Sequence, residues 1–203
     1  DSGKLEGRVY GASNNALFGK REVSTLFETL DRDRWAITEN GNSTVSMSPY
    51  GLKIRCDSSA GNAAKAGLAS RSFGKEKLDS RIVKFDVDTT NLRDVNHTAY
   101  FLTGDNNTEG FGFKITNEQV YGVIIANGSE STVNLNDTVG FTGAYEAHCF
   151  SGRVYFYLNS PNPKGYLDGV NNETQYETNL FYFENKSAGA SSNFIVGYAG
   201  IVA

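Results

Sequence analysis

Short runs of apolar residues recur along most of this chain and are separated by Gly, Asn, Asp and Ser. Most runs alternate: in Val-Lys-Phe-Asp-Val at 83–87 the apolar residues fall on one face and the charged residues on the other. Alternation with turn residues every ~8–12 positions is typical of an antiparallel sandwich or barrel. The clearest runs are 45–47, 52–56, 82–87, 99–103, 111–115, 120–126, 144–150, 154–158, 180–183 and 194–198.

We therefore predict an all-β fold, an antiparallel β-sandwich of roughly twelve to fourteen strands. Phe85, Phe113, Ile115 and Phe156 are expected to point into its core. One window has a helical period instead, because Val23, Leu26, Phe27 and Leu30 recur at i, i+3, i+4 and i+7. We expect one short helix over residues 23–30.

Residues 1–22 are rich in glycine and poor in large apolar side chains. We interpret them as an N-terminal arm that precedes a single sandwich domain at 23–203. Leu5, Val9 and Tyr10 would belong to one strand of this arm, which can pair with an open sheet edge of a neighbouring subunit. Such pairing predicts a homo-oligomer or surface assembly, as a ring or filament. An edge strand within the same domain, or an unstructured terminus, explains the same residues.

Composition narrows the classes of partner. The formal net charge is −4, and no basic patch with interleaved aromatics occurs, so nucleic-acid binding is not expected. No apolar run approaches the ~18 residues that a membrane span requires. The chain begins with Asp1, which predicts a processed N-terminus or an excised fragment unless the numbering is a convention.

Seven Asn-x-Ser/Thr triplets favour an exported protein. Chance predicts about three for 20 Asn and 33 Ser plus Thr in 203 residues. An extracellular, cell-surface or virion-surface glycoprotein is therefore one interpretation, and ordinary Asn-rich turns are the other. The candidate acceptors are Asn42, Asn96, Asn106, Asn127, Asn136, Asn172 and Asn185.

Cys56 and Cys149 lie in separate predicted strands. They would form a disulfide between sheets in an exported sandwich, or remain two buried thiols, and the sequence leaves both alternatives open. Neither has a second Cys or a His at the spacing of a metal site.

Several segments resemble the concanavalin A-like lectin/glucanase superfamily, in the LamG-like form of viral and microbial surface proteins. The segments are Trp35 with Gly41 and Gly51-Leu-Lys-Ile54, the meander of 110–116, 119–126 and 131–135, Tyr145-Glu-Ala-His148, and Arg153-Val-Tyr-Phe-Tyr-Leu-Asn159. The resemblance covers about 160 residues and implies a jelly-roll sandwich. Ser160 and Pro161 stand where the superfamily has a turn glycine. Its members include lectins, hydrolases, lyases and structural modules, so the fold does not settle function.

The sequence offers little for catalysis. Hydrolases of the superfamily carry a strand of the form E-x-D-x-x-E, and the nearest approach here is Asp86-Val-Asp88, with Asn91 in place of the third acid. Tyr155 loosely resembles a lyase tyrosine, but no Gln-x-His strand accompanies it. Only His97 and His148 are available as bases, and there is no G-x-S-x-G elbow. We expect no catalytic residue.

Binding chemistry is better represented. Asp105, Asn107 and Glu109 form an oxygen-rich loop that is a possible Ca²⁺ site, and no other cofactor is expected. Aromatic platforms for a glycan would come from Tyr100, Tyr121, Tyr155, Tyr157 and Tyr182. Cross-strand aromatic pairing, which stabilises any sheet, explains the same tyrosines.

Three functions remain. We place first a non-catalytic extracellular or virion-surface structural or assembly module, and second a carbohydrate-binding, lectin-like module. A polysaccharide lyase or glycoside hydrolase comes third.

Overall fold

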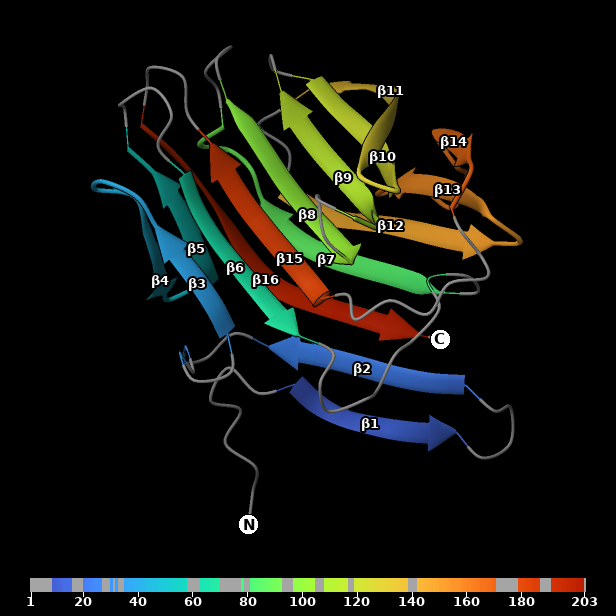
Figure 1. The fold of residues 1–203 in the computed structure, drawn as a ribbon, viewed down its shortest axis with the longest axis horizontal. Coiled ribbons are helices and arrows are strands. Elements are labelled where there is room, and N and C mark those ends of the chain that lie inside the picture. Colours follow the sequence, from blue (N-terminus) through green and yellow to red (C-terminus); the bar gives the residue numbers. More distant parts are fainter. Residues whose placement is uncertain are drawn as a thin grey trace.

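The computed structural model describes residues 9–15, 20–26, 30, 32, 35–57, 63–69, 78, 81–92, 97–104, 108–116, 119–138, 142–170, 179–186 and 191–202. These ranges contain sixteen strands (Figure 1). They are β1 (Val9–Asn15), β2 (Lys20–Leu26), β3 (Trp35–Glu39), β4 (Thr44–Ser48), β5 (Gly51–Cys56), β6 (Ala63–Ala69), β7 (Ile82–Asp88), β8 (Thr98–Gly104), β9 (Gly110–Thr116), β10 (Gln119–Ala126), β11 (Ser129–Thr138), β12 (Thr142–Phe150), β13 (Arg153–Leu158), β14 (Gly165–Asp168), β15 (Asn179–Lys186) and β16 (Ser192–Val202).

The strands form two antiparallel sheets packed as layers, with the seven-stranded sheet in front in Figure 1. That sheet has the order β11-β10-β9-β8-β15-β6-β3. The other has nine strands, in the order β1-β2-β16-β7-β12-β13-β14, with β5 also paired to β16 and β4 to β5. The predicted all-β antiparallel sandwich is confirmed.

The short helix predicted over 23–30 is wrong where the structure describes it. Residues 23–26 belong to β2, which pairs with β16 through Val23↔Ile201 and Leu26↔Tyr198. An apolar period over eight residues is too short to separate helix from strand, and an open sheet edge supplies the hydrogen bonds that decide it. No helix in the described part of the chain is long and apolar enough to cross a membrane.

The predicted N-terminal arm contributes strands to the chain's own sheet. β1 and β2 form a hairpin, and β2 adds it to the edge beside β16 (Figure 1). Val9 and Tyr10 lie in β1, Leu5 lies outside the described residues, and the predicted domain boundary after residue 22 falls within β2. Exchange of this strand between copies stays a prediction.

Aromatic rings from both sheets form the centre of the core. Phe101 of β8 contacts Phe113 of β9 at a ring-centroid distance of 5.7 Å, and it meets Phe85 and Tyr145 of the opposite sheet at 5.7 and 4.8 Å. The predicted core positions are confirmed, since the four side chains are at most 1% exposed. They are Phe85, Phe113, Ile115 and Phe156.

Cys56 and Cys149 are not joined in a disulfide, and both are buried. Their strands, β5 and β12, belong to the same sheet and are separated by β16 and β7. Three strand spacings of ~4.8 Å are about 14 Å, more than a disulfide can bridge. Of the two alternatives that the sequence leaves open, the bridge between sheets is therefore not formed, and the two cysteines are buried thiols.

Asn185 is not a glycan acceptor in this fold. Its side chain is buried, and its amide donates to the carbonyl oxygens of Ile54 and Ser192, both at 3.2 Å. It thereby links β15 of one sheet to β5 and β16 of the other. Asn42 and Asn127 are exposed in turns, so their sequons stay predictions. Asn96, Asn106 and Asn172 lie outside the described residues, as does the side chain of Asn136 in β11.

Candidate functional site

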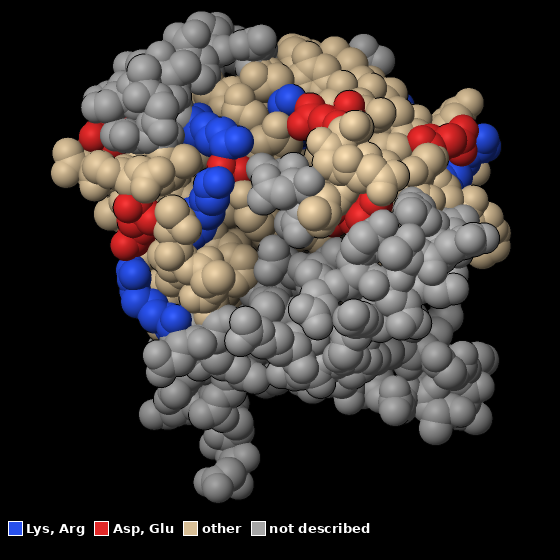
Figure 2. Space-filling model, in the orientation of Figure 1, with Lys and Arg blue, Asp and Glu red and all other residues tan. Residues whose placement is uncertain are grey.

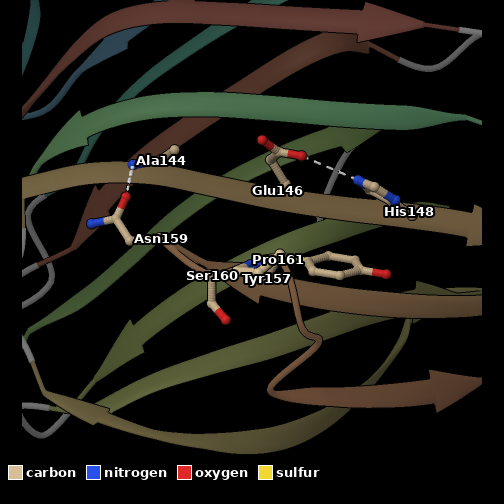
Figure 3. Close-up of a pocket in the computed structure, with 7 residues that line it drawn as sticks. All are labelled: Ala144, Glu146, His148, Tyr157, Asn159, Ser160 and Pro161. Atoms are coloured by element: carbon tan, nitrogen blue, oxygen red, sulfur yellow. Dashed lines mark hydrogen bonds and ion pairs between the residues drawn. The ribbon is translucent and has the colours of Figure 1, made fainter.

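A pocket of about 500 Å³ lies on the outer face of the nine-stranded sheet, over β12, β13 and the turn that follows β13 (Figure 3). Its lining combines one aromatic ring with a carboxylate, an imidazole and an amide. The residues are Ala144, Glu146, His148, Tyr157, Asn159, Ser160 and Pro161.

Strand alternation places these side chains together. In β12, Tyr145, Ala147 and Cys149 are buried in the core, so Glu146 and His148 face outward. In β13 the buried Val154, Phe156 and Leu158 leave Tyr155 and Tyr157 outward in the same way.

The antiparallel register then brings the outward side chains of the two strands into contact. It sets Tyr157 opposite Glu146, and His148 is the diagonal neighbour of Tyr157. The His148 and Tyr157 rings have centroids 4.5 Å apart. The β12–β13 hairpin therefore places the Tyr157 ring, the His148 imidazole and the Glu146 carboxylate side by side on its outward surface.

Glu146 is an ionised acceptor in this pocket. It pairs with Lys84 Nζ of β7 at 2.9 Å and with His148 Nε2 at 3.2 Å. Burial alone raises the pKa of the Glu146 carboxyl, but the hydrogen bonds with Lys84 and His148 outweigh it, so the pKa lies below its ordinary value. Because an ionised carboxylate only accepts, this contact requires a proton on His148 Nε2.

This ion pair predicts a dependence of stability on acid pH. A folded-state pKa below the ordinary 4.5 means that the unfolded chain binds the proton more readily. The contribution of Glu146 is then complete above about pH 4.5 and is lost as pH falls through the lowered folded-state value. Glu146→Gln should therefore unfold at a lower temperature than the unmodified protein at pH 7, and the gap should narrow as pH falls below 4.5.

Thermal unfolding followed by circular dichroism at several pH values measures the gap. Lys84→Met is the matched variant, because it removes one of the two partners and should reduce the same pH dependence while His148 remains. A gap of constant size from acid to neutral pH would contradict the assignment.

The turn after β13 fixes one wall of the pocket. Asn159 has a φ of 44°, a left-handed conformation that Asn tolerates better than most residues. Its Oδ1 accepts the Ala144 N–H at 2.9 Å, and its own N–H donates to the Ala144 carbonyl at 3.0 Å. Ser160 and Pro161, which replace the turn glycine of the superfamily, line the same wall.

The five predicted glycan-binding tyrosines are divided between two surfaces. Tyr155 and Tyr157 face outward on β13, and Tyr157 lines the pocket. Tyr100, Tyr121 and Tyr182 face outward on the seven-stranded sheet. There the Tyr100 and Tyr182 rings are buried, and their hydroxyls donate to Glu130 and Glu184, both at 2.8 Å. These two rings are covered and do not serve as open platforms.

The face of the seven-stranded sheet is also occupied by ion pairs. Glu184 is fully buried and pairs with Lys65 and Lys186 at 3.2 and 3.3 Å. Figure 2 shows Lys, Arg, Asp and Glu side chains interspersed on the side of the molecule that this sheet presents. Among the described residues of this face, Lys65 and Lys186 pair with Glu184, and Lys114 pairs with Glu130.

Asp86 and Asp88 face outward on β7, next to the pocket. Asp86 is opposite Ala144 on β12, which makes Glu146 its diagonal neighbour at about 7–8 Å between Cα atoms. Asp88 accepts the Thr90 N–H at 3.0 Å and its hydroxyl at 2.7 Å, so it also shapes a turn. Asp86 and Glu146 thus lie on one face, although the E-x-D-x-x-E strand is absent from the sequence.

The predicted calcium site is described only at Glu109. This side chain is buried, and its Oε1 accepts the Asn127 N–H at 2.8 Å. Asp105 and Asn107 lie outside the described residues. Among the residues that the structure describes, no group of three or more His, Cys, Asp or Glu side chains is placed to hold a metal ion. The calcium site stays a prediction.

The sequence interpretation missed Glu146 and treated His148 as an ordinary strand residue. The signal for both was the alternation in Tyr145-Glu-Ala-His148, which points the two polar side chains to the same face as Tyr157 once the hairpin is paired.

No protein-family model and no curated protein matches this chain. Solved structures do match. A protein of unknown function from Shewanella oneidensis has a TM-score of 0.58 and 14% identity, over 97% of this chain and 90% of that chain. A glycoside hydrolase family 16 endo-glucanase from Bacteroides ovatus has a TM-score of 0.60 and 11% identity, over 88% of this chain and 98% of that chain. A β-1,3-glucanase from Mycobacterium marinum has a TM-score of 0.57 and 11% identity, over 84% of this chain and 91% of that chain.

The fold is a concanavalin A-like jelly-roll sandwich. The glucanases have this architecture, and the two antiparallel sheets described above match it, which confirms the resemblance noted in the sequence.

The comparisons also correct the order of the three functions. The sequence alone favours a non-catalytic structural or assembly module at an extracellular or virion surface, and this prediction is wrong. The matching structures with a named activity include glucanases and other glycosyl hydrolases, so they favour the carbohydrate-active alternative that was placed third. At 8–14% identity these structures establish the fold, and the chemistry depends on the residues of this chain.

Proposed function

We propose that this chain is a carbohydrate-active protein that binds a polysaccharide in the pocket over β12 and β13. The observation that carries the proposal is the convergence of the Tyr157 ring, the ionised Glu146 carboxylate and the Asn159 amide on one open pocket (Figure 3). A sugar ring has an apolar C–H face and a rim of hydroxyls, so an aromatic surface beside fixed acceptors and donors matches it.

Each side chain has a role in this proposal. The Tyr157 ring packs against the C–H face of a sugar, and Glu146 accepts its hydroxyl protons. Lys84 and His148 hold the carboxylate in place before the ligand arrives, which lowers the conformational entropy lost on binding. The Asn159 side-chain NH₂ remains a donor, because the Ala144 N–H uses its oxygen. A neutral β-glucan is the first ligand to test, since glucanases share the fold.

Glycoside hydrolysis is the second candidate. Asp86 and Glu146 favour it, because two carboxylates on one face are the minimum that the reaction requires. Glu146, with its lowered pKa, would be the base or nucleophile of such a pair, and Asp86 would have to be the acid. Release of reducing ends from a mixed-linkage β-glucan tests this candidate, and it should disappear in both Asp86→Asn and Glu146→Gln.

Tyr157→Ala should weaken binding of a soluble mixed-linkage β-glucan about tenfold, because it removes the apolar platform. Titration calorimetry measures the affinity. Tyr166→Ala is the matched control, since Tyr166 is an exposed tyrosine of the neighbouring β14 that lines no part of the pocket. Equal affinities of Tyr157→Ala and the unmodified protein would contradict the proposed site.

A further inference from the structure

A second pocket of about 330 Å³ opens on the same face of the nine-stranded sheet. Tyr50, Asp86, Asp88, Gly143 and Gly197 contribute to its lining. The binding site proposed above does not include this pocket, although Asp86, the acid of the hydrolysis candidate, lines it. Its aromatic wall is Tyr50, which is 79% exposed and stands in the turn between β4 and β5.

The pocket is located where the sheet divides. Residues 192–196 of β16 pair with β5, whereas residues 198–202 pair with β2. On its other side β16 pairs with β7, and the register shifts between Val196 and Tyr198. Gly197 stands at this change of partner, between the segment paired with β5 and the segment paired with β2. The β4–β5 turn approaches it closely, since a Cβ added at Gly197 would lie 3.3 Å from the Tyr50 carbonyl oxygen. The depression therefore arises from the strand pairing itself.

The turn that carries Tyr50 is held in one conformation. The Tyr50 N–H donates to Ser48 Oγ at 3.2 Å, and the Ser48 hydroxyl donates to the Gly51 carbonyl at 3.0 Å. An ordered backbone with an exposed ring is the arrangement that a stacking platform requires, because little conformational freedom is lost on binding.

The two pockets are adjacent. Gly143 of the second precedes Ala144 of the first on β12, and Asp86 of the second is opposite Ala144. In the order β16-β7-β12-β13 they cover three strand spacings, or about 14 Å. Such a span exceeds a single sugar ring and fits an extended chain.

We infer that one glycan chain crosses strands β13, β12, β7 and β16, with sugar rings on Tyr157 at one end and on Tyr50 at the other. This inference rests on the proposed function and adds the direction and minimum length of the ligand.

The charged side chains that line the two adjacent pockets, which together form one groove, determine the class of glycan that fits. Asp86, Asp88 and Glu146 line the two pockets, and no described Lys or Arg does. Of the cations on this face, Lys84 of β7 is paired with Glu146, and Lys53 of β5 is opposite Ile195 but lines neither pocket. Carboxylates accept hydroxyl protons and repel anions, so the groove fits a neutral polysaccharide and disfavours a polyuronate.

Tyr50→Ala tests the inference, with a disaccharide and a hexasaccharide of a mixed-linkage β-glucan as probes in titration calorimetry. Affinity for the hexasaccharide should fall about five- to tenfold, while affinity for the disaccharide should stay unchanged. Tyr157→Ala should weaken both. Phe150→Ala is the matched control, since Phe150 is 69% exposed and lies outside both pockets.

The outcomes separate the two proposals. If the unmodified protein binds the hexasaccharide and Tyr50→Ala does not change its affinity, the second subsite is wrong and the first pocket stands. If neither sugar binds the unmodified protein, the proposed function itself fails. A polyuronate that binds as tightly as the neutral chain overturns the charge selection.

Discussion

Phe101→Ala is expected to lower the free energy of unfolding by about 3–5 kcal/mol. The Phe101 ring is fully buried between the sheets and contacts aromatic rings of both. Removing it deletes these contacts and leaves a cavity that β-strands fixed by hydrogen bonds do not close. A domain of this size is stable by ~5–15 kcal/mol, so the variant would lose a large part of its stability.

Urea unfolding followed by tryptophan fluorescence measures this loss, because Trp35 is buried and stacks on Phe183 of the core at a centroid distance of 6.0 Å. Phe150→Ala is the control. It removes the same side chain from the exposed end of β12 and should change stability by no more than about 0.5 kcal/mol. Similar losses in the two variants would contradict the assignment of Phe101 to the centre of the core.

Alternation of apolar and polar residues along the sequence predicts the strands that have one buried face and one exposed face. The run at 82–87 becomes β7 (Ile82–Asp88), with Val83, Phe85 and Val87 buried as the pattern requires. β6 (Ala63–Ala69) escaped prediction, because alanine and glycine have little preference for strands. Its small side chains fit where β3 and β15 flank it and Trp35 stacks on Phe183, a context that only the three-dimensional structure supplies.

The candidate site shows a different limit of prediction from sequence. Tyr100 and Tyr157 look alike in sequence, since each alternates with buried residues on a strand. Tyr100 is covered and donates to Glu130, thirty residues along the chain, whereas Tyr157 borders an open pocket. Periodicity identifies which side chains leave the core, but the distribution of covered and open areas on an outer face depends on contacts between distant segments.

Tyr50 shows the same limit in a turn. Its sequence context, Ser-Pro-Tyr-Gly, predicts a tight connection and gives no reason to assign it to a binding surface. The ring gains its position because the turn covers the place where β16 changes partner from β5 to β2. Pairing between residues 136 to 144 positions apart in the chain, from Ser192↔Cys56 to Val196↔Leu52, thus creates this part of the site.

Gly51→Ala is expected to lower the free energy of unfolding by about 2–5 kcal/mol, with two causes. Gly51 has a φ of +133°, which a residue with a Cβ adopts only under strain. A Cβ at this position would also lie 2.2 Å from the Val196 carbonyl oxygen, so the backbone of β5 or β16 would have to move. Because Gly51 follows Tyr50 in the turn, the same change should weaken hexasaccharide binding.

Gly169→Ala separates the two causes. Gly169 has a comparable φ of +113°, but the nearest atom to its added Cβ is 3.7 Å away, an ordinary contact. This variant should show the conformational strain alone, about 1–3 kcal/mol, and Gly51→Ala should exceed it by the cost of the clash. Urea unfolding of both variants provides the comparison. Equal losses would show that the Val196 main chain yields without cost, and the division of the sheet at β16 would then not be rigid enough to hold Tyr50 in place.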